Sequence, residues 1–508
     1  MSPLLPLRAR LAEVADVSHA AAVLEWDQET YMPTGGAGAR GRQVATLRRI
    51  AHERFTDPTV GEWLAGATPE TDLDRALVRV TKRDWDRATL LPARLIAEKA
   101  EVSARAKEAW KAAREADTFE LFAPHLDAVL GLAREEADAV APLIVAERGP
   151  GYAPSASDAR YDALLDAFEP GASTASVAAV FDQLQAGLVP LVAAVADAPT
   201  PDDTFLHAPF DADAQWAFGL EVATALGYSL DHGRQDLAAH PFTTAFGHTD
   251  VRVTTRVDPA FFPTAFFGTV HEVGHALYEQ GLAPELAQTP LADGTSLGVH
   301  ESQSRLYENL VARSAPFWDW AYPGVQSRFP QLAGVERGAF VRAINKVAPS
   351  LVRVEADELT YHLHVLLRFR LERAMLAGDL AVADLPEAWR EEMRELLGVV
   401  PETDADGCLQ DIHWSLGAVG YFPTYTLGTL MSVQLWTAAD AALGGLNAQV
   451  AAGDFGPLLA WLREHVHRWG RARTADEVLV GATGQSLDAE PWLAYARDKM
   501  AGLYGVSV

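Results

Sequence analysis

Apolar residues recur at three- and four-residue spacing along much of the chain, among arginine, glutamate and alanine. This period predicts amphipathic helices, because it places the apolar side chains on one face of each helix. Glycine and proline cluster at residues 148–151 and 198–202, where we expect helices to end. The helices expected on these grounds span residues 37–55, 72–117, 121–147, 174–196 and 264–281.

The clearest strand signal lies at residues 250–257, which alternate and are rich in β-branched side chains. This segment stands one short loop ahead of the helix at 264–281, where an edge strand could pair with a peptide backbone. Strand signals are few, so we expect a mostly α fold with a very small β-sheet near that helix. The sequence has no internal repeat and no flexible linker, which favours a single domain over residues 1–508, with two lobes as a further expectation.

Composition and charge exclude several classes of protein. The chain has 508 residues, of which 49% are apolar, so we expect a globular protein with a large core. Its net charge of −27 argues against a nucleic-acid partner and against an anionic membrane surface. Cys408 is the one cysteine, which suits a reducing compartment. We find no signal peptide and no window of membrane-spanning length, so a soluble cytoplasmic enzyme is expected.

The run His271-Glu272-Val273-Gly274-His275 carries the most chemistry. Residues i and i+4 of a helix project from one face, so the two histidines can hold one metal ion. The intervening Glu272 lies near that ion and can take a proton from water bound to it. This arrangement is typical of a zinc peptidase, and it requires a third ligand from elsewhere.

Glu301 is the best candidate for the third ligand, 301 − 275 = 26 residues after the second histidine. That separation allows a loop and a returning helix. Its neighbour His300 is the nearest competitor, although it faces about 100° away if both residues are helical. Glu308 and Ser304 are expected beside the ligands, where they would orient them.

Groups suited to bind a peptide and its transition state lie further along the chain. His413, Tyr421 and Tyr425 can donate hydrogen bonds to an oxyanion, although tyrosines at this spacing also pack cores. Arg353 can receive a terminal carboxylate, with nearby acidic residues to orient it, but a surface ion pair at a helix start explains it equally well. The pair His465 and His467, spaced i, i+2, is interpreted as a solvated helix face.

Six ordered segments together resemble the carboxypeptidase Taq family of metallocarboxypeptidases, and the likeness extends from about residue 20 to residue 505. The matching segments are Trp26 to Pro33, Asp250 to Thr254, His271 to His275, His300 to Arg305, Val352 to Asp357, and Gly407 to Trp414.

The resemblance implies a large, nearly all-helical fold of the gluzincin type with a deep groove. It implies a homodimer that releases single residues from peptide C-termini with broad tolerance. Zn²⁺ is the expected metal, with Co²⁺ or another divalent ion as the alternative.

The family pattern also assigns roles to residues of this sequence. It places the metal on His271, His275 and Glu301, the general base on Glu272, and carboxylate recognition on Arg353. His413 and Tyr425 fall where the family keeps transition-state donors, and Tyr421 is a further member of that group. Arg252 is a candidate substrate contact. Two rivals stay open, an oligopeptidase that cuts internally and a non-catalytic binding protein with a structural metal.

Overall fold

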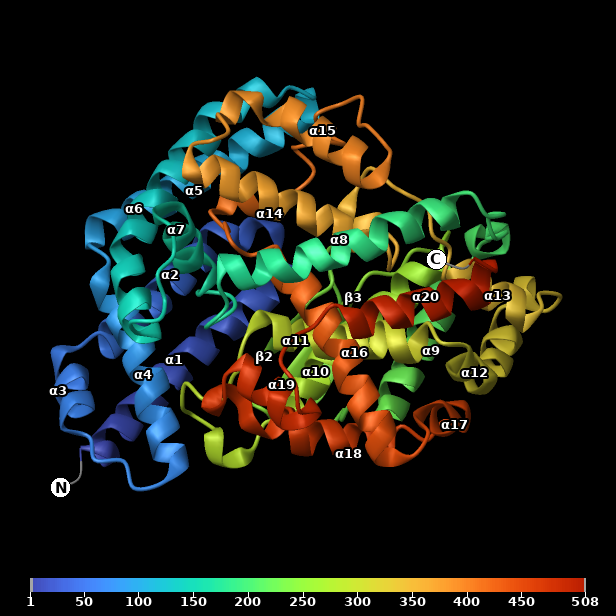
Figure 1. Ribbon diagram of the computed structural model, residues 1–508. Helices are drawn as coiled ribbons and strands as arrows, with labels where there is room; N and C mark the ends of the chain where they lie inside the picture. The colour runs from blue at the N-terminus through green and yellow to red at the C-terminus, as the bar shows by residue number, and fades with distance from the viewer. Residues whose placement is uncertain (1–2, 507–508) are drawn as a thin grey trace. The chain divides into compact units, whose positions relative to one another are not determined.

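The computed structural model describes residues 3–506, and most of them are helical (Figure 1). This confirms the expected mostly α fold with a very small sheet. The chain divides into two compact units, each assembled from three segments. Unit 1 comprises Met1–Thr89, Pro201–Ile344 and Met431–Ser486, and unit 2 comprises Leu90–Thr200, Asn345–Leu430 and Leu487–Val508.

Unit 1 contains the sheet and the helix with the two histidines. Its longer helices are α1 (Leu4–Thr30), α2 (Ala37–Phe55), α3 (Pro58–Gly66), α4 (Asp72–Leu90), α9 (Ala212–Leu226), α10 (Phe262–Gln280), α11 (Leu297–Arg305), α12 (Ala315–Arg328), α13 (Arg337–Ile344), α17 (Leu446–Ala451), α18 (Gly456–His465) and α19 (Ala475–Thr483). A π-helical turn, η5 (Leu306–Ala312), continues α11. Its 3₁₀ turns are η1 (Thr34–Gly36), η3 (Thr204–His207), η4 (Pro284–Leu286), η6 (Pro330–Leu332) and η10 (His467–Ala472).

Unit 2 contains helices and no strand among the residues that the structure describes. Its helices are α5 (Ala93–Ala116), α6 (Ala123–Arg148), α7 (Ala156–Leu165), α8 (Thr174–Ala196), α14 (Tyr361–Ala377), α15 (Leu385–Leu397) and α20 (Glu490–Tyr504), and α16 (Pro423–Leu443) belongs to it up to Leu430. Its 3₁₀ turns are η2 (Phe119–Leu121), η7 (Arg353–Glu355), η8 (Val382–Asp384) and η9 (His413–Leu416).

Two predicted helices are confirmed to the residue, those at 121–147 and 264–281 are confirmed with ends one or two residues away, and one is divided. The predicted spans 37–55 and 174–196 match α2 and α8. The predicted helix 72–117 is two helices, α4 and α5, separated at Leu91 and Pro92. Pro92 lacks a backbone N–H and disfavours helical backbone in the residue before it, so the pattern could not continue across it.

The sheet has three strands in the order β1-β3-β2, namely β1 (Gly233–Leu237), β3 (Val251–Thr255) and β2 (Thr243–Ala245). β1 pairs with β3 in parallel and β2 pairs with β3 antiparallel. The predicted strand at 250–257 is therefore confirmed as β3, but the expectation of an edge position is wrong. β3 is the central strand, and β2 is the edge strand that packs near α10.

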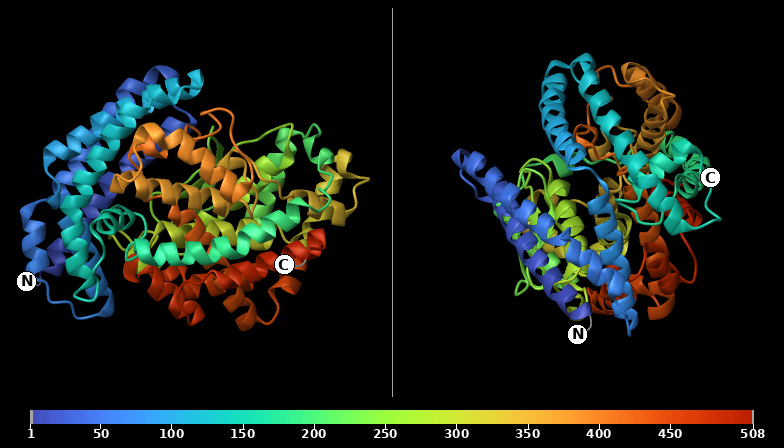
Figure 2. Two further views of the ribbon diagram at one scale, coloured as in Figure 1. Left: turned by 45° about the horizontal axis from the view of Figure 1, so that its top comes forward. Right: turned by 90° about the vertical axis from the view of Figure 1, so that its left-hand side faces the viewer.

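α10 is the structural centre of unit 1. It packs against α9, α11, η5, β2 and β3, and most of its side chains are buried. At its C-terminal end Gly281 approaches the His467 ring so closely that any Cβ would lie 2.4 Å from Nδ1. Helices α1 and α2, also in unit 1, lie side by side (Figure 2). Arg40 donates to Asp27, and Arg54 donates to Glu13. These contacts show that the two helices are antiparallel.

Among the residues that the structure describes, one helix, α8, is long and apolar enough to cross a membrane by length and composition. The expectation that no window reaches that length is therefore wrong. Leu188, Leu191 and Val192 on this helix are buried, and α8 packs on α7, α15 and α20 within unit 2. Length and composition alone are weak evidence for a membrane span, because a core helix meets the same criteria.

Candidate active site

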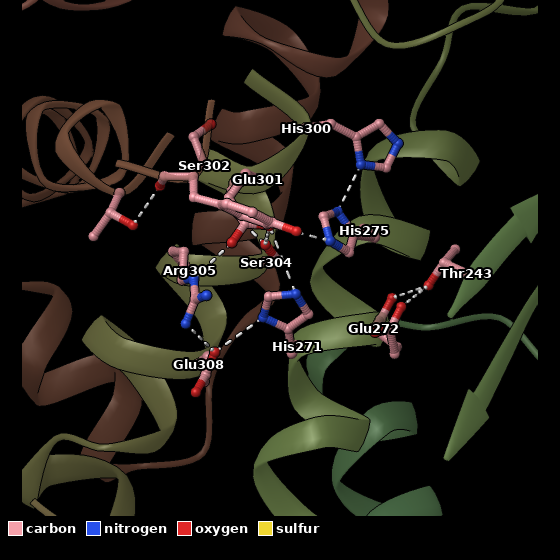
Figure 3. A network of polar contacts seen from close by, with 12 residues as sticks. Thr243, His271, Glu272, His275, His300, Glu301, Ser302, Ser304, Arg305 and Glu308 are labelled. Atoms are coloured by element: carbon pink, nitrogen blue, oxygen red, sulfur yellow. Dashed lines mark hydrogen bonds and ion pairs between the residues drawn. The ribbon is translucent and has the colours of Figure 1, made fainter. Parts of the chain in front are cut away.

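Three side chains of unit 1 converge on one point. His271 and His275 lie one turn apart on α10, and Glu301 reaches them from α11 (Figure 3). Glu301 Oε2 lies 3.6 Å from His271 Nε2 and 3.4 Å from His275 Nε2, and one ligand atom from each residue lies within 4.8 Å of the others. Two donor atoms on a tetrahedral zinc ion, each about 2.0–2.1 Å from it, are about 3.4 Å apart. The two nitrogens and one carboxylate oxygen therefore fit a divalent ion in both chemistry and spacing.

Gly274 explains why Glu301 can reach the histidines. A Cβ at this position would lie 2.6 Å from Gln303 O and 2.6 Å from Ser304 Cα on the facing helix. The backbones of α10 and α11 are therefore in direct contact at Gly274, which only glycine allows. Ser296 caps the start of α11 by accepting from Val299 N–H, which fixes the register of the helix that carries Glu301.

A second layer of charged groups orients the three side chains. His271 Nδ1 lies 2.9 Å from Glu308 Oε2, and this contact leaves Nε2 facing Glu301. Glu308 belongs to the π-helical turn η5, and Arg305 and Arg313 both contact it at 3.2 Å. Arg305 Nε also donates to Glu301 Oε1 at 2.7 Å. Burial opposes ionisation of Glu301, but Arg305 and the two histidines outweigh it and hold the pKa of Glu301 well below its usual range.

His300 lies behind the three converging side chains. Its Nδ1 is 2.6 Å from His275 Nδ1, and its Nε2 is 2.8 Å from Glu279 Oε1. His300 thus contacts the distal nitrogen of His275 and is not a member of the group formed with Glu301. Burial lowers the pKa of His275 to about 3, which keeps its imidazole neutral and its lone pair available.

Glu272 lies on α10 between the histidines and is buried. The Thr243 hydroxyl, on β2, lies 2.7 Å from Glu272 Oε2 and 2.9 Å from Glu272 O (Figure 3). Burial raises the pKa of Glu272. Nothing in the spacing around residue 243 signals this contact, because it depends on how β2 packs against α10.

In unit 2, Arg353 is buried and bonded at both ends of its guanidinium. Nε and Nη2 donate to Asp411 Oδ1 at 3.1 and 2.7 Å, and Nη1 donates to the Tyr361 hydroxyl at 2.7 Å. Asp411 also accepts from Arg368 Nε at 2.7 Å. The sequence predicts that neighbouring acidic residues orient Arg353, but these residues have other partners. Asp357 accepts from the backbone N–H and the hydroxyl of Thr360, and Glu358 binds Lys499.

The three transition-state candidates lie together in unit 2. The Tyr425 hydroxyl is 3.4 Å from His413 Nε2, the His413 and Tyr421 rings are 5.2 Å apart, and the two tyrosine rings are 5.3 Å apart. The Arg353 guanidinium lies 5.1 Å from the centre of the Tyr425 ring. Burial lowers the pKa of His413 to about 4, so its ring is neutral near pH 7 and keeps one N–H to donate.

Arg252, the remaining candidate, pairs with a carboxylate and lies near two aromatic rings in unit 1. It donates to Asp250 through Nε and Nη2, at 2.8 and 2.9 Å. Its guanidinium lies 4.3 Å from the Trp26 ring and 4.9 Å from the Phe246 ring. Arg252 therefore attaches α1 to the sheet.

His467 corrects a further prediction. It is fully buried, and its Nε2 lies 2.9 Å from Gln303 Oε1, next to the metal-site helix α11. The solvated-face interpretation was wrong because α18 ends at His465 and the backbone turns into η10 before His467. A helical spacing rule does not apply across that turn.

Two histidines and a glutamate in this arrangement, with a further glutamate between the histidines on a helical fold, define a metallopeptidase. The family model described as carboxypeptidase Taq (M32) metallopeptidase matches residues 6–500, so the chain belongs to that family. The chain is therefore a metallocarboxypeptidase, and a divalent metal belongs to its activity.

Relatives of known name agree along nearly their whole lengths. The chain is 44% identical to thermostable carboxypeptidase 1 of Thermus thermophilus and 37% identical to that of Pyrococcus furiosus, over 97% of each chain in both comparisons. It is similar in structure to the M32 carboxypeptidase of Deinococcus radiodurans R1, with a TM-score of 0.94 at 41% identity, covering 99% of this chain and 100% of that one.

Proposed function

We propose that the metallocarboxypeptidase is a zinc enzyme that releases single amino acids from peptide C-termini, with broad tolerance for the side chain released. The convergence of His271, His275 and Glu301, with Glu272 on the same helix, is the observation that carries the proposal. A divalent ion held by the three ligands would act as a Lewis acid toward the peptide carbonyl and would lower the pKa of water to about 7.

The residues of the chain would perform the remaining steps. Glu272 takes the proton from the attacking water and passes it to the leaving amine. Its burial supports this role, since burial raises the carboxyl pKa and a raised pKa suits a group that takes and returns a proton. The Thr243 hydroxyl holds the carboxylate in position. His413, Tyr425 and Tyr421 would donate hydrogen bonds to the developing oxyanion.

Arg353 would receive the free carboxylate of the peptide. Arg353 and Arg368 share the single carboxylate of Asp411, so this buried group carries one uncompensated positive charge. An anionic substrate group would balance that charge. Arg252 is a weaker candidate for substrate binding, because it pairs with a carboxylate of its own, Asp250, whereas Arg353 shares Asp411 with Arg368.

The proposed partners are peptides with a free C-terminus and a second copy of the chain as a homodimer. The net charge of −27 supports the proposed lack of nucleic-acid and anionic-membrane partners. A cytoplasmic location is proposed because the single Cys408 is buried and free.

The decisive experiment compares a peptide with its C-terminally amidated twin after loading with Zn²⁺. A carboxypeptidase should release the last residue of the free acid and leave the amide uncut. Internal cleavage of both peptides would favour the oligopeptidase. If the loaded protein cut neither peptide, the binding-protein alternative would be supported. Substituting Co²⁺ for Zn²⁺ would show which ion supports turnover.

A further inference from the structure

A cavity of about 510 Å³ lies within unit 1, between α1 and the edge strand β2. α1 contributes apolar side chains and His19 to its lining, and β2 contributes Thr243, Thr244 and Ala245. Its remaining charged lining consists of Asp84, Glu279, Asp293 and Arg471. The proposed chemistry at the metal assigns no role to this cavity.

The residues that line this cavity include more carboxyl groups than arginines. Arg471 donates to both carboxylate oxygens of Asp84 at 2.8 Å, and Arg83 Nη1 lies 3.3 Å from Asp84 Oδ1, so both arginines pair with that carboxylate. Glu279 and Asp293 remain. Asp293 is exposed, and its partial burial in the cavity and the charge of Glu279 both raise its pKa.

His300 connects Glu279 to the candidate metal site. Its Nδ1 lies 2.6 Å from His275 Nδ1, and its Nε2 lies 2.8 Å from Glu279 Oε1. Glu279 and Asp293 are thus two carboxyl groups on the wall of one cavity, and His300 holds the first of them in place.

The same cavity is bordered by unused backbone groups. Thr254 N–H bonds Phe242 O, and Phe246 N–H bonds Asp250 O, so the bonded pairs of β2 and β3 fall at residues 242, 244 and 246. Bonded and non-bonded pairs alternate in an antiparallel ladder. The backbone groups of Thr243 and Ala245 therefore point away from β3, along the free edge that borders the cavity.

The cavity also adjoins the catalytic helix. Thr243 lines the cavity, and its hydroxyl contacts Glu272 at 2.7 Å. A peptide extended along β2 thus runs from the proposed general base into the cavity.

We propose that this cavity binds the part of a peptide substrate upstream of the scissile bond, and that Glu279 and Asp293 bind a cationic group there. The inference rests on the proposed carboxypeptidase function and names its preferred substrates, peptides with a basic upstream side chain or a free α-ammonium group. The edge strand binds the backbone of any sequence, and the two carboxylates select the charge.

The test uses the metal-loaded full chain and N-acetylated hexapeptides with one fixed C-terminal residue. Lysine replaces norleucine at each upstream position in turn, which changes the charge and nearly preserves the shape. At one or two adjacent positions lysine should lower KM about fivefold relative to norleucine, as expected for a partly exposed ion pair. A second set, all norleucine with a free instead of an acetylated N-terminus, shows whether the α-ammonium group alone suffices.

Variants connect the preference to the cavity. Asp293→Asn should remove most of the lysine advantage, and Asp293→Lys should reverse it. Glu285→Gln is the matched control, because this exposed carboxylate of unit 1 lies outside the cavity and should preserve the preference. Glu279→Gln is a second variant, read together with bound metal because it also changes the contact to His300.

Equal KM for lysine and norleucine at every position, with the C-terminal residue still released, would overturn the cavity assignment and leave the carboxypeptidase intact. A lysine preference that survives both Asp293→Asn and Glu279→Gln would also overturn it. If no free-acid peptide is hydrolysed at all, the proposed function fails first and the cavity loses its substrate with it.

Discussion

The metal site of unit 1 and the arginine cluster of unit 2 are built on opposite charges. Around His271 and His275 the three carboxyl groups of Glu272, Glu301 and Glu308 outnumber Arg305 and Arg313, which pair with Glu301 and Glu308, so a cation is favoured. Around Asp411 the surplus is positive, since two arginines share one carboxylate. The first group is prepared for a divalent ion and the second for an anion, and a peptide carboxylate is an anion of suitable size.

The two regions also differ in how they are assembled. The histidines are separated by one helical turn, so the geometry of their helix places them together. The contacts of Asp411 join residues 58 and 43 positions away in sequence. Local spacing therefore specifies the metal site, whereas the arginine cluster depends on the packing of unit 2.

Glu272→Gln tests the metal site with the largest expected effect. The amide keeps the shape and can still contact Thr243, but it cannot take a proton, so kcat should fall about 10²- to 10⁴-fold. Metal analysis should show the same ion content as the parent, and KM for the peptide should be nearly unchanged. Turnover at the parent rate would remove Glu272 from the mechanism.

The convergence of His271, His275 and Glu301 is the part of the candidate site that the sequence predicts most completely. His271, His275 and Glu301 were paired because helix geometry and one returning helix are enough to bring them together. Gly274 stands inside the motif, but its purpose became visible only with the facing backbone of Ser304. The roles of Thr243 and Glu279 could not be predicted, since each depends on an element far away in sequence.

For the arginine cluster, the sequence indicates Arg353 as a functional residue but does not predict the residues that bind it. Arg353 was chosen for its fork of donors, and neighbouring acids were expected to hold it, whereas Asp411 does so. The predicted edge position of the strand is wrong for a related reason. Alternation predicts that residues 251–255 form a strand, but it does not predict which strands lie beside it in the sheet. Contacts between segments far apart in the sequence determine both the partner of Arg353 and the position of β3 in the sheet. The periodicity of a single sequence does not predict such contacts.

Asp411→Asn tests the arginine cluster. It would leave two buried guanidinium groups without their shared anion, so the free energy of unfolding should fall by about 3–5 kcal/mol in chemical denaturation. The matched control is Asp138→Asn, which breaks the exposed pair with Arg160 in the same unit and should cost less than about 1 kcal/mol. Similar losses in both variants would mean that the buried cluster contributes little to unit 2.

Glu372 gives unit 2 a pH dependence that the metal site does not explain. Burial raises the pKa of its carboxyl from 4.5 to about 7, although Trp414 Nε1, the Tyr161 hydroxyl, Gly420 N–H and the charge of Arg368 all favour the anion. The folded carboxyl keeps its proton where the unfolded one has lost it. Its contribution is therefore fully present below about pH 4.5 and is lost as pH rises through 7.

The size of that contribution is about 3 kcal/mol, at about 1.4 kcal/mol for each unit between 4.5 and 7. Unfolding free energies measured from pH 5 to 8 should decline in the parent and decline less in Glu372→Gln, which cannot ionise. An identical slope in both proteins would assign the pH dependence to other groups.

Gly274→Ala reaches the metal site through packing alone and should have the smallest effect. The new Cβ would meet the backbone of Gln303 and Ser304, so α11 must move away and carry Glu301 with it. Overpacking of this kind costs about 1–3 kcal/mol, and alanine returns about 1 kcal/mol through its helix propensity. The free energy of unfolding should therefore fall by about 0–2 kcal/mol, while zinc affinity falls about tenfold because Glu301 no longer meets the two histidines.

Gly268→Ala, in the same helix α10, is the control that separates the effect of the close backbone contact from the effect of alanine's higher helix propensity. Within 4 Å of a Cβ at Gly268 there is no atom among the neighbours that the structure describes, so this variant should gain stability and keep its zinc affinity. Titration of zinc into the two apo variants measures the difference directly. Equal affinities would show that α11 adapts to the added methyl group, and that the close contact at Gly274 does not hold Glu301 in place.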